Sequence, residues 1–84
     1  MNYNGWTNYA TWRVNLEMFD GTTASDIGTT NAAELQTTLR ELAEEMIEST
    51  SSEGLARDYA LAFLSDVNWW EIADHMIEAE TEEA

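Results

Sequence analysis

Cysteine, proline and lysine are all absent from this sequence of 84 residues. Without cysteine, the chain has neither disulfide bonds nor thiolate metal ligands. No apolar run approaches the roughly 20 residues that a membrane-spanning helix needs. The first residues also lack the basic segment and following apolar segment of a secretory signal. We therefore expect a soluble intracellular protein with no membrane partner.

Basic charge is scarce as well. Only three Arg oppose 17 acidic residues, so the formal net charge is −14. Such a chain repels nucleic-acid phosphates and anionic membranes, both of which bind to basic patches. The charge instead favours a cationic partner, either the basic surface of a protein or metal ions. The plainer alternatives are that the acidity serves solubility alone or adapts the protein to a salty host.

Residues that could perform catalysis are few. A single His and no Cys leave few nucleophile–base pairs, and the chain has no Gly-rich phosphate loop or nucleophile elbow. Carboxylates are abundant, but glycoside hydrolysis requires two of them across a cleft, which a helical domain of this length seldom has. We therefore expect that the protein is not an enzyme and uses no catalytic residues and no cofactor.

What the chain does contain is enough apolar sequence to fold. Its hydrophobic fraction is 44%, and its length suits one domain. Helical periods cover residues 7–19, 31–48 and 53–64 and the chain from 68 onward, with a further turn around 25–27. We therefore predict an all-α fold, a compact bundle of about four short helices. Residues 1–84 form a single acidic helical domain, and its ends, 1–5 and 80–84, are expected to fray.

The segment 7–19 fits two patterns. Large apolar residues such as Tyr9, Trp12 and Leu16 recur every three or four residues, as on one face of a helix. Residues 11–18 also alternate between apolar and polar, as in a strand. We favour the helix, because no second strong strand is present to pair with the first and a lone strand is unstable. Some β character at 11–18 is the alternative.

Local signals indicate where the later helices start and which faces they bury. Asn31 and Asn68 each precede a Glu by three residues, the spacing of a capping box, with Thr30 as an alternative first cap. The stripes expected to face inward are Leu35, Leu39, Leu42 and Met46; then Leu55, Tyr59, Ala62 and Phe63; and finally Trp69, Ile72, Ala73 and Met76. The predicted core consists of Trp6, Tyr9, Trp12, Leu16, Leu39, Leu42, Trp69 and Ile72.

Acidic residues share a separate face of each of two predicted helices. Ordinary helix faces mix signs, because Glu–Lys pairs four residues apart stabilise a helix and like pairs destabilise it. Glu41 and Glu45 are separated by a rise of about 6 Å, and Glu44 and Glu48 bring the charge density towards that of DNA, with one phosphate per about 3.4 Å of each strand. The residues that we expect to bind a partner are Glu34, Glu41, Glu44, Glu45, Glu48, Glu71, Asp74 and Glu78.

Two further groups of residues make weaker candidates for a site. Glu71, His75 and Glu78 have helical spacings that suit part of a divalent-metal site, but no other ligand is marked and a solvated His among carboxylates is commoner, so we predict no metal. Trp70 and Ile77 lie off the inward stripe of the last helix. They either widen the core or leave an apolar patch for a partner.

Three stretches of the sequence resemble a known group of proteins. Trp6-Thr7-Asn8-Tyr9-Ala10-Thr11-Trp12 resembles the Asn-Tyr-Ala-Thr-Trp signature near the N-terminus of a family of small bacteriophage and plasmid proteins. Two later stretches are similar to further segments of that group: Ala60-Leu61-Ala62-Phe63-Leu64 and Asn68-Trp69-Trp70-Glu71-Ile72-Ala73. The resemblance implies a mobile-element origin and a location in the bacterial cytoplasm. It carries over no catalytic or binding residues.

Mobile elements commonly encode small acidic proteins that disarm restriction or CRISPR enzymes by imitating DNA. This chain is similar to them in size and charge, though not in any motif. The leading hypothesis is therefore an inhibitor, encoded by a phage or plasmid, that binds a basic nucleic-acid-binding host protein by acidic mimicry and does not contact nucleic acid itself. The alternative is a small structural or adaptor protein that associates through its apolar patch. Either would be a monomer or a homodimer.

Overall fold

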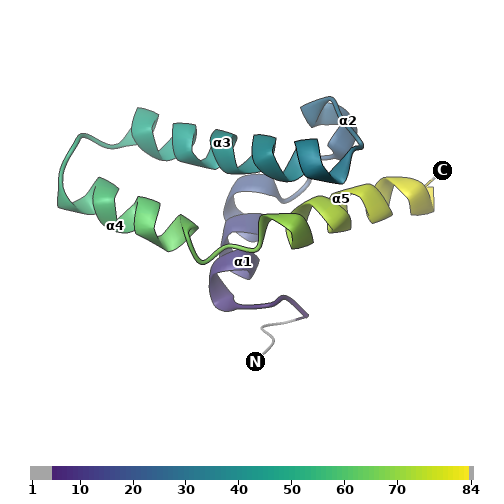
Figure 1. Cartoon of the computed structure of the whole chain (residues 1–84), viewed down its shortest axis with the longest axis horizontal. Helices are drawn as coiled ribbons and strands as arrows, with labels where there is room; N and C mark the ends of the chain where they lie inside the picture. Colours follow the sequence, from purple (N-terminus) through teal and green to yellow (C-terminus); the bar gives the residue numbers. More distant parts are fainter. Residues whose placement is uncertain (1–4, 84) are drawn as a thin grey trace.

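The computed structural model describes residues 5–83, with side chains through residue 80, and consists of helices arranged as a bundle (Figure 1). In chain order the elements are α1 (Tyr9–Val14), the π-helical η1 (Asn15–Phe19), α2 (Ala24–Ile27), α3 (Ala32–Thr50), α4 (Leu55–Leu64) and α5 (Trp69–Glu83). The described part contains no strand, so the all-α prediction is confirmed and β character at 11–18 is wrong. None of the described helices combines the length and apolarity that a membrane span requires.

The predicted fraying of residues 1–5 and 80–84 can be compared with the structure only in part. Residues 1–4 and 84 lie outside the described residues. At the other end, α5 continues through Glu83, and the Glu80 carboxylate accepts a hydrogen bond from α2. The helix therefore extends past the point where fraying was expected to begin.

α1 and η1 form one continuous helical segment with defined ends. Asn8 caps the start of α1, where its Oδ1 accepts a hydrogen bond from the Thr11 N–H (2.9 Å). η1 ends at Phe19, whose carbonyl accepts from the Thr22 N–H (2.9 Å). Gly21, within this turn, has a φ of 83°, which glycine adopts without steric cost. The helix predicted over 7–19 is thus present from Tyr9 to Phe19, and a turn closes it.

α2 is a single helical turn with a cap at each end. Thr23 Oγ1 accepts a hydrogen bond from the Asp26 N–H (3.1 Å), and Asp26 Oδ2 accepts one from the Thr23 N–H (3.0 Å). Gly28 ends the turn in the left-handed conformation, with a φ of 107°. The turn attaches to α5 through Ser25, whose N–H donates to Glu80 Oε1 (2.6 Å).

The contact between Ser25 and Glu80 should be lost in acid. The Ser25 N–H holds the pKa of the Glu80 carboxyl below its usual value of 4.5. Because this pKa is lower in the folded protein than in the unfolded chain, the contact contributes stability above pH 4.5 and loses it as the pH falls through the lowered value. We expect the Ser25 amide resonance to titrate over that acid range in NMR spectra and to stay constant in Glu80→Gln. The same titration in both proteins would contradict the contact.

The core lies where α3 and α5 pack together, with α1 and η1 crossing them (Figure 1). Leu35 and Leu39 on α3 and Ile72 on α5 are fully buried. Burying an aliphatic side chain of this size stabilises a fold by about 1.5–3 kcal/mol. The predicted inward stripe of α5 is confirmed, because all four of its members are buried: Trp69, Ile72, Ala73 and Met76.

The buried face of α3 departs from the prediction along its second half. After Leu35 and Leu39 the next buried residue is Ala43, whereas Leu42 is only partly buried and Met46 is 38% exposed. Figure 1 shows the reason, since α5 runs beside the N-terminal half of α3 and α4 lies beside its C-terminal half. The packed face of α3 therefore turns from one neighbour to the other along the helix.

The buried face predicted for α4 is wrong. Leu55 and Tyr59 are 67% and 69% exposed, Ala62 is exposed, and Phe63 is only partly buried. The side of α4 that packs contains Leu64, which is buried. α4 has apolar residues on most of its circumference, so its sequence fits several inward faces equally well. Contacts with α3 and α1 decide which face is used.

Half of the aromatic core predicted around α1 is also wrong. Tyr9 and Leu16 are 44% and 46% exposed, and Trp6 and Trp12 are partly buried. The buried residues of α1 are instead small or β-branched: Ala10, Thr11 and Val14. Small side chains let α1 approach α4 and α5 closely, and the large rings are left along the edges of the contact.

A buried hydroxyl determines how α1 sits on the rest of the fold. Thr11 is fully buried, and its Oγ1 accepts a hydrogen bond from the Asn68 N–H (2.8 Å) at the start of α5. The same hydroxyl donates to Asn8 Oδ1 (2.7 Å). Asn68 Oδ1 in turn accepts from the Glu71 N–H (3.1 Å), so the cap of α1 and the predicted cap of α5 are joined through Thr11.

Three further hydrogen bonds tie the N-terminal segment to the same place. The Thr7 N–H donates to both carboxylate oxygens of Glu71 (2.9 and 3.2 Å), and Asn8 Nδ2 donates to the Asp66 carbonyl (2.8 Å). We call this network the N-terminal clamp and define it as Thr7, Asn8, Thr11, Asn68 and Glu71. It joins two segments about 60 residues apart in sequence, the kind of long-range hydrogen bonding that holds a buried polar group in place.

Candidate acidic interface

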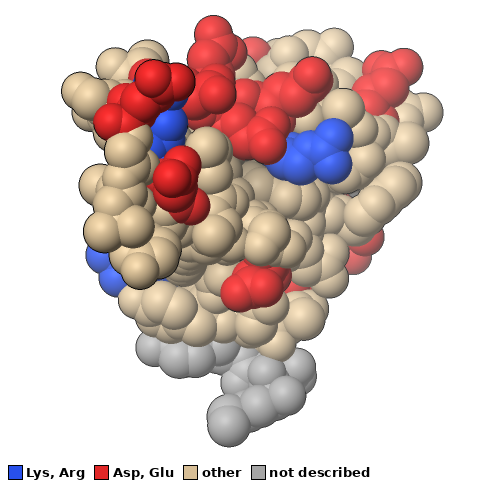
Figure 2. Space-filling view, turned by 60° about the vertical axis from the view of Figure 1, so that its left-hand side comes forward, with Lys and Arg blue, Asp and Glu red and all other residues tan. Residues whose placement is uncertain are grey.

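The acidic residues of α3 occupy the face opposite its core. Taking about 100° per residue, all five lie within an arc of roughly 100°, on the side of the helix away from Leu39 and Ala43. All five are exposed. Figure 2 shows Asp and Glu side chains gathered along the upper part of the molecule, where Figure 1 places α3. We call this surface the α3 acidic stripe; its members are Glu34, Glu41, Glu44, Glu45 and Glu48.

The density of charge is highest in the second half of this stripe. From Glu41 to Glu48 the helix rises about 10.5 Å, so four carboxylates follow one another at a mean interval of about 3.5 Å. Phosphates along one DNA strand are about 3.4 Å apart. The carboxylates stand on a rigid helix, and so they hold this spacing without the cost of ordering a flexible chain.

Basic side chains form no ion pair with the α3 acidic stripe among the described residues. Arg13 and Glu17 make the one ion pair found among the described residues (2.6 Å), and both lie in the α1–η1 segment. Arg57 Nη2 donates to the main-chain carbonyls of Glu48 (2.7 Å) and Ser51 (2.8 Å), where it satisfies the C-terminal end of α3. Arg40 is exposed on α3 itself and pairs with no carboxylate in the described part of the chain.

Glu34 differs from the other members of the stripe. It stands in the first turn of α3, where its N–H donates to Asn31 Oδ1 (3.0 Å) and its carboxylate accepts from the Thr29 hydroxyl (3.0 Å). A carboxylate at a helix N-terminus also stabilises the helix by interaction with the macrodipole. Glu34 is exposed but has a structural role, and Asn31 rather than Thr30 is the cap.

The acidic residues predicted on α5 do not join the stripe. Asp74 and Glu78 are exposed. The inward faces of α3 and α5 pack against each other, so the outer faces of the two helices point in different directions. Glu71 is partly buried, and its carboxylate accepts hydrogen bonds from the N-terminal segment, so it is already engaged within the fold. The structure thus places five of the eight predicted residues in the α3 acidic stripe, Asp74 and Glu78 on another surface, and Glu71 in contact with the N-terminal segment.

The weaker metal-site hypothesis finds no support in the structure. Within the described residues, no three His, Asp or Glu side chains gather closely enough to hold a metal ion. Glu71 is occupied by the Thr7 N–H. The His75 ring stacks on Trp6, with ring centroids 4.1 Å apart and planes inclined by 26°. Two of the three candidate metal ligands, Glu71 and His75, therefore contact the N-terminal segment instead.

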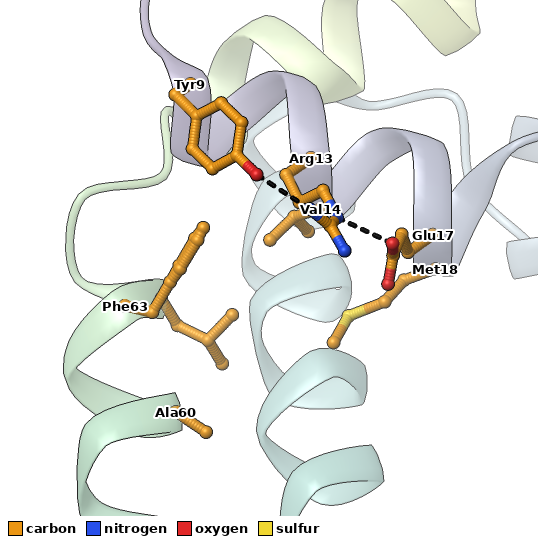
Figure 3. A pocket seen from close by; sticks show the side chains of 8 residues that line it. Tyr9, Arg13, Val14, Glu17, Met18, Ala60 and Phe63 are labelled. Carbon is orange, nitrogen blue, oxygen red and sulfur yellow. Dashed lines mark hydrogen bonds and ion pairs between the residues drawn. The ribbon is translucent and has the colours of Figure 1, made fainter.

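A groove between α1, η1 and α4 was not predicted from the sequence. Its volume is about 310 Å³. At its mouth, Arg13 donates to the Tyr9 hydroxyl through Nη1 (2.6 Å) and to Glu17 Oε1 through Nε (2.6 Å), as Figure 3 shows. The bond to Tyr9 and then the one to Glu17 raise the pKa of Arg13, which keeps it charged. The groove is lined by Tyr9, Arg13, Val14, Glu17, Met18, Ala60, Phe63 and Leu64.

Comparisons with protein-family models, curated proteins and solved structures found no match to this chain. The candidate sites therefore rest on the geometry and charge described above.

Proposed function

We propose that this protein binds a basic nucleic-acid-binding protein through the α3 acidic stripe and inhibits it by occupying the surface that receives nucleic acid. The observation that carries this proposal is the run of four exposed carboxylates from Glu41 to Glu48, at phosphate-like intervals and without ion-pair partners in the described structure. A groove that attracts DNA phosphates attracts this helix by the same long-range field.

The class of target rests on the resemblance to phage and plasmid proteins. A mobile element benefits from an inhibitor of host defence, so the proposed target is a CRISPR effector or a restriction enzyme in the bacterial cytoplasm. Asp74 and Glu78 supply long-range attraction in this proposal, and Glu71 has no part in binding.

The adaptor hypothesis depended on an exposed apolar patch formed by Trp70 and Ile77, and these two side chains differ in exposure. Trp70 is 49% exposed, but Ile77 is partly buried and packs against the core. The largest exposed apolar side chains are instead on α4.

The first test is recovery of the target and its dependence on the stripe. Tagged protein is incubated with bacterial lysate at low and high salt, and bound proteins are identified by mass spectrometry. We expect a nucleic-acid-binding protein that elutes with salt, because screening weakens contacts between exposed charges. The variant E41Q/E44Q/E45Q/E48Q should bind this protein at least about tenfold more weakly, since loss of close charge pairs at an interface costs several times RT.

A second variant with the same change in net charge serves as the control. D20N/E53Q/D74N/E78Q removes four exposed carboxylates outside the stripe. We expect it to slow association slightly and to leave the affinity within about threefold of the original, because peripheral charges act mainly through steering. Equal losses of affinity in the two variants would show that net charge, not the stripe, drives binding. Partners whose binding does not weaken as the salt concentration rises would contradict the proposed DNA mimicry.

A further inference from the structure

The outer side of α4 is apolar where a solvent-facing helix is usually polar. Leu55 and Tyr59 are the two most exposed large apolar side chains of the described structure, and with the exposed Ala62 they follow one another at steps of four and three. This spacing places them in one stripe along the helix. Leu64, the buried residue of α4, lies on the opposite side, so the stripe is not part of the core.

This stripe adjoins the groove between α1, η1 and α4. Phe63 follows Tyr59 by four residues, so the two side chains are neighbours on the helix surface. Phe63 lines the groove and stacks with Tyr9 across it, with ring centroids 6.2 Å apart. In Figure 3, Phe63 extends from α4 towards Tyr9, and Ala60 faces the same groove. The stripe and the groove form one continuous apolar surface, which we call the α4 face.

The charges around the α4 face are acidic. Glu53 precedes α4, Asp58 lies within it and Asp66 follows it; all three are exposed, and none has an ion-pair partner in the described structure. Arg57, the one base of α4, is directed to carbonyls at the end of α3. Arg13 at the groove mouth is neutralised by Glu17. An occupant of this face thus gains from apolar contact in the middle and from positive charge at its edges.

We propose that the α4 face binds an amphipathic helix of another protein, apolar on one side and flanked by Lys or Arg. A helix laid in an apolar groove is an established mode of recognition, with anchors spaced as on one helix face. A second copy of this chain is the poorer occupant, because each copy has a net charge of −14. The proposal does not rest on the function proposed for α3, since the surface and the chemistry of the partner both differ.

The test uses synthetic peptides as probes of this chemistry. A fluorescein-labelled Leu/Lys peptide of about 18 residues, with its Leu on one helical face, covers five turns. A second peptide has the same composition in an order that scatters Leu around the helix, and a third replaces Lys by Glu. Fluorescence anisotropy measures their binding to the intact protein at about 0.15 M salt, where long-range attraction is largely screened.

We expect the first peptide to bind and the other two to bind at least about tenfold more weakly. The scrambled peptide loses the apolar contact of one Leu or more, and the acidic peptide loses its attraction to the acidic edges of the α4 face. In the protein, L55S/Y59S should weaken the first peptide by at least about tenfold for the same reason. Because both side chains are mostly exposed, this variant should keep the circular-dichroism spectrum and thermal midpoint of the parent.

Trp70→Ser is the matched control. Trp70 is a half-exposed aromatic side chain on α5, a different helix from α4. It lies about 140° around α5 from His75, so it is also away from the side that contacts the N-terminal segment. Its loss should leave peptide affinity unchanged.

Equal binding of the scrambled peptide, or equal loss of affinity in Trp70→Ser, would overturn the proposal in favour of unspecific attraction. Absence of binding by the first peptide would also overturn the proposal. So would a homodimer detected by light scattering that the L55S/Y59S substitutions dissociate, because the occupant of the α4 face would then be a second copy of the chain. The α3 stripe variant E41Q/E44Q/E45Q/E48Q should still bind the first peptide, so the two proposals can fail separately.

Discussion

Replacing Leu39 with Ala should lower the free energy of unfolding by about 2–5 kcal/mol, a large part of the stability of a small domain. Leu39 is fully buried in the middle of α3. Removing its side chain forfeits the transfer free energy of the lost atoms and leaves a cavity that the surrounding helices fill only in part. Urea unfolding followed by circular dichroism measures the change, and we expect the variant to be partly unfolded at room temperature.

Leu55→Ala is the matched control, because it deletes the same atoms from a helix of the same fold. Leu55 is 67% exposed, and most surface substitutions change stability by no more than about 0.5 kcal/mol. A loss comparable to that of Leu39→Ala would mean that Leu55 is covered in the folded protein and that α4 is rotated relative to the structure described above. The pair therefore tests the packing of α3 and the orientation of α4 together.

Replacing Thr11 with Val should destabilise the protein by about 1–3 kcal/mol, although Val has nearly the same shape. The Thr11 hydroxyl is buried, accepts from the Asn68 N–H and donates to Asn8. Valine leaves that N–H and the Asn8 oxygen with one partner fewer in a place where water has little access. Leaving a buried donor unpaired costs its full desolvation, which exceeds the net contribution of an ordinary hydrogen bond.

Thr37→Val is the corresponding control. The Thr37 hydroxyl donates to the Ala33 carbonyl of its own helix, and its loss should change stability by no more than about 0.5 kcal/mol. Hydrogen exchange supplies a second measurement, since the Asn68 amide should exchange faster in Thr11→Val and not in Thr37→Val. Unchanged protection at Asn68 would contradict the N-terminal clamp even if the global stability fell.

The clamp joins two of the segments, 6–12 and 68–73, for which a resemblance to phage and plasmid proteins was expected. Asn8 and Thr11 belong to the first segment, Asn68 and Glu71 to the second, and in this chain they meet through hydrogen bonds. These residues hold α1 on the start of α5. The α3 acidic stripe lies outside the segments on which the resemblance was based, whereas the α4 face includes Tyr9, Ala60 and Phe63 from them.

Much of the candidate acidic site could be predicted because exposure on a long helix follows from its period. Once Leu35 and Leu39 face inward, Glu41 and Glu45 must face outward. Glu71 could not be assigned in this way. It lies on the outer face of α5 by period, yet a distant N–H reaches it, and nothing in the local sequence marks that approach. The α4 face was missed for a related reason, since the apolar circumference of α4 was taken as a core signal.

The sequence by itself determined the helical class, the caps at Asn31 and Asn68, the inward stripe of α5 and the outward stripe of α3. Each depends on residues within one or two turns, where hydrogen bonds and the helical period act locally. Only the tertiary structure decided the rotation of α1 and α4, the burial of Thr11 in place of Tyr9, and the role of Glu71. Those features arise from contacts between segments distant in the chain, and the choice among nearly equivalent apolar faces depends on which neighbouring helix covers them.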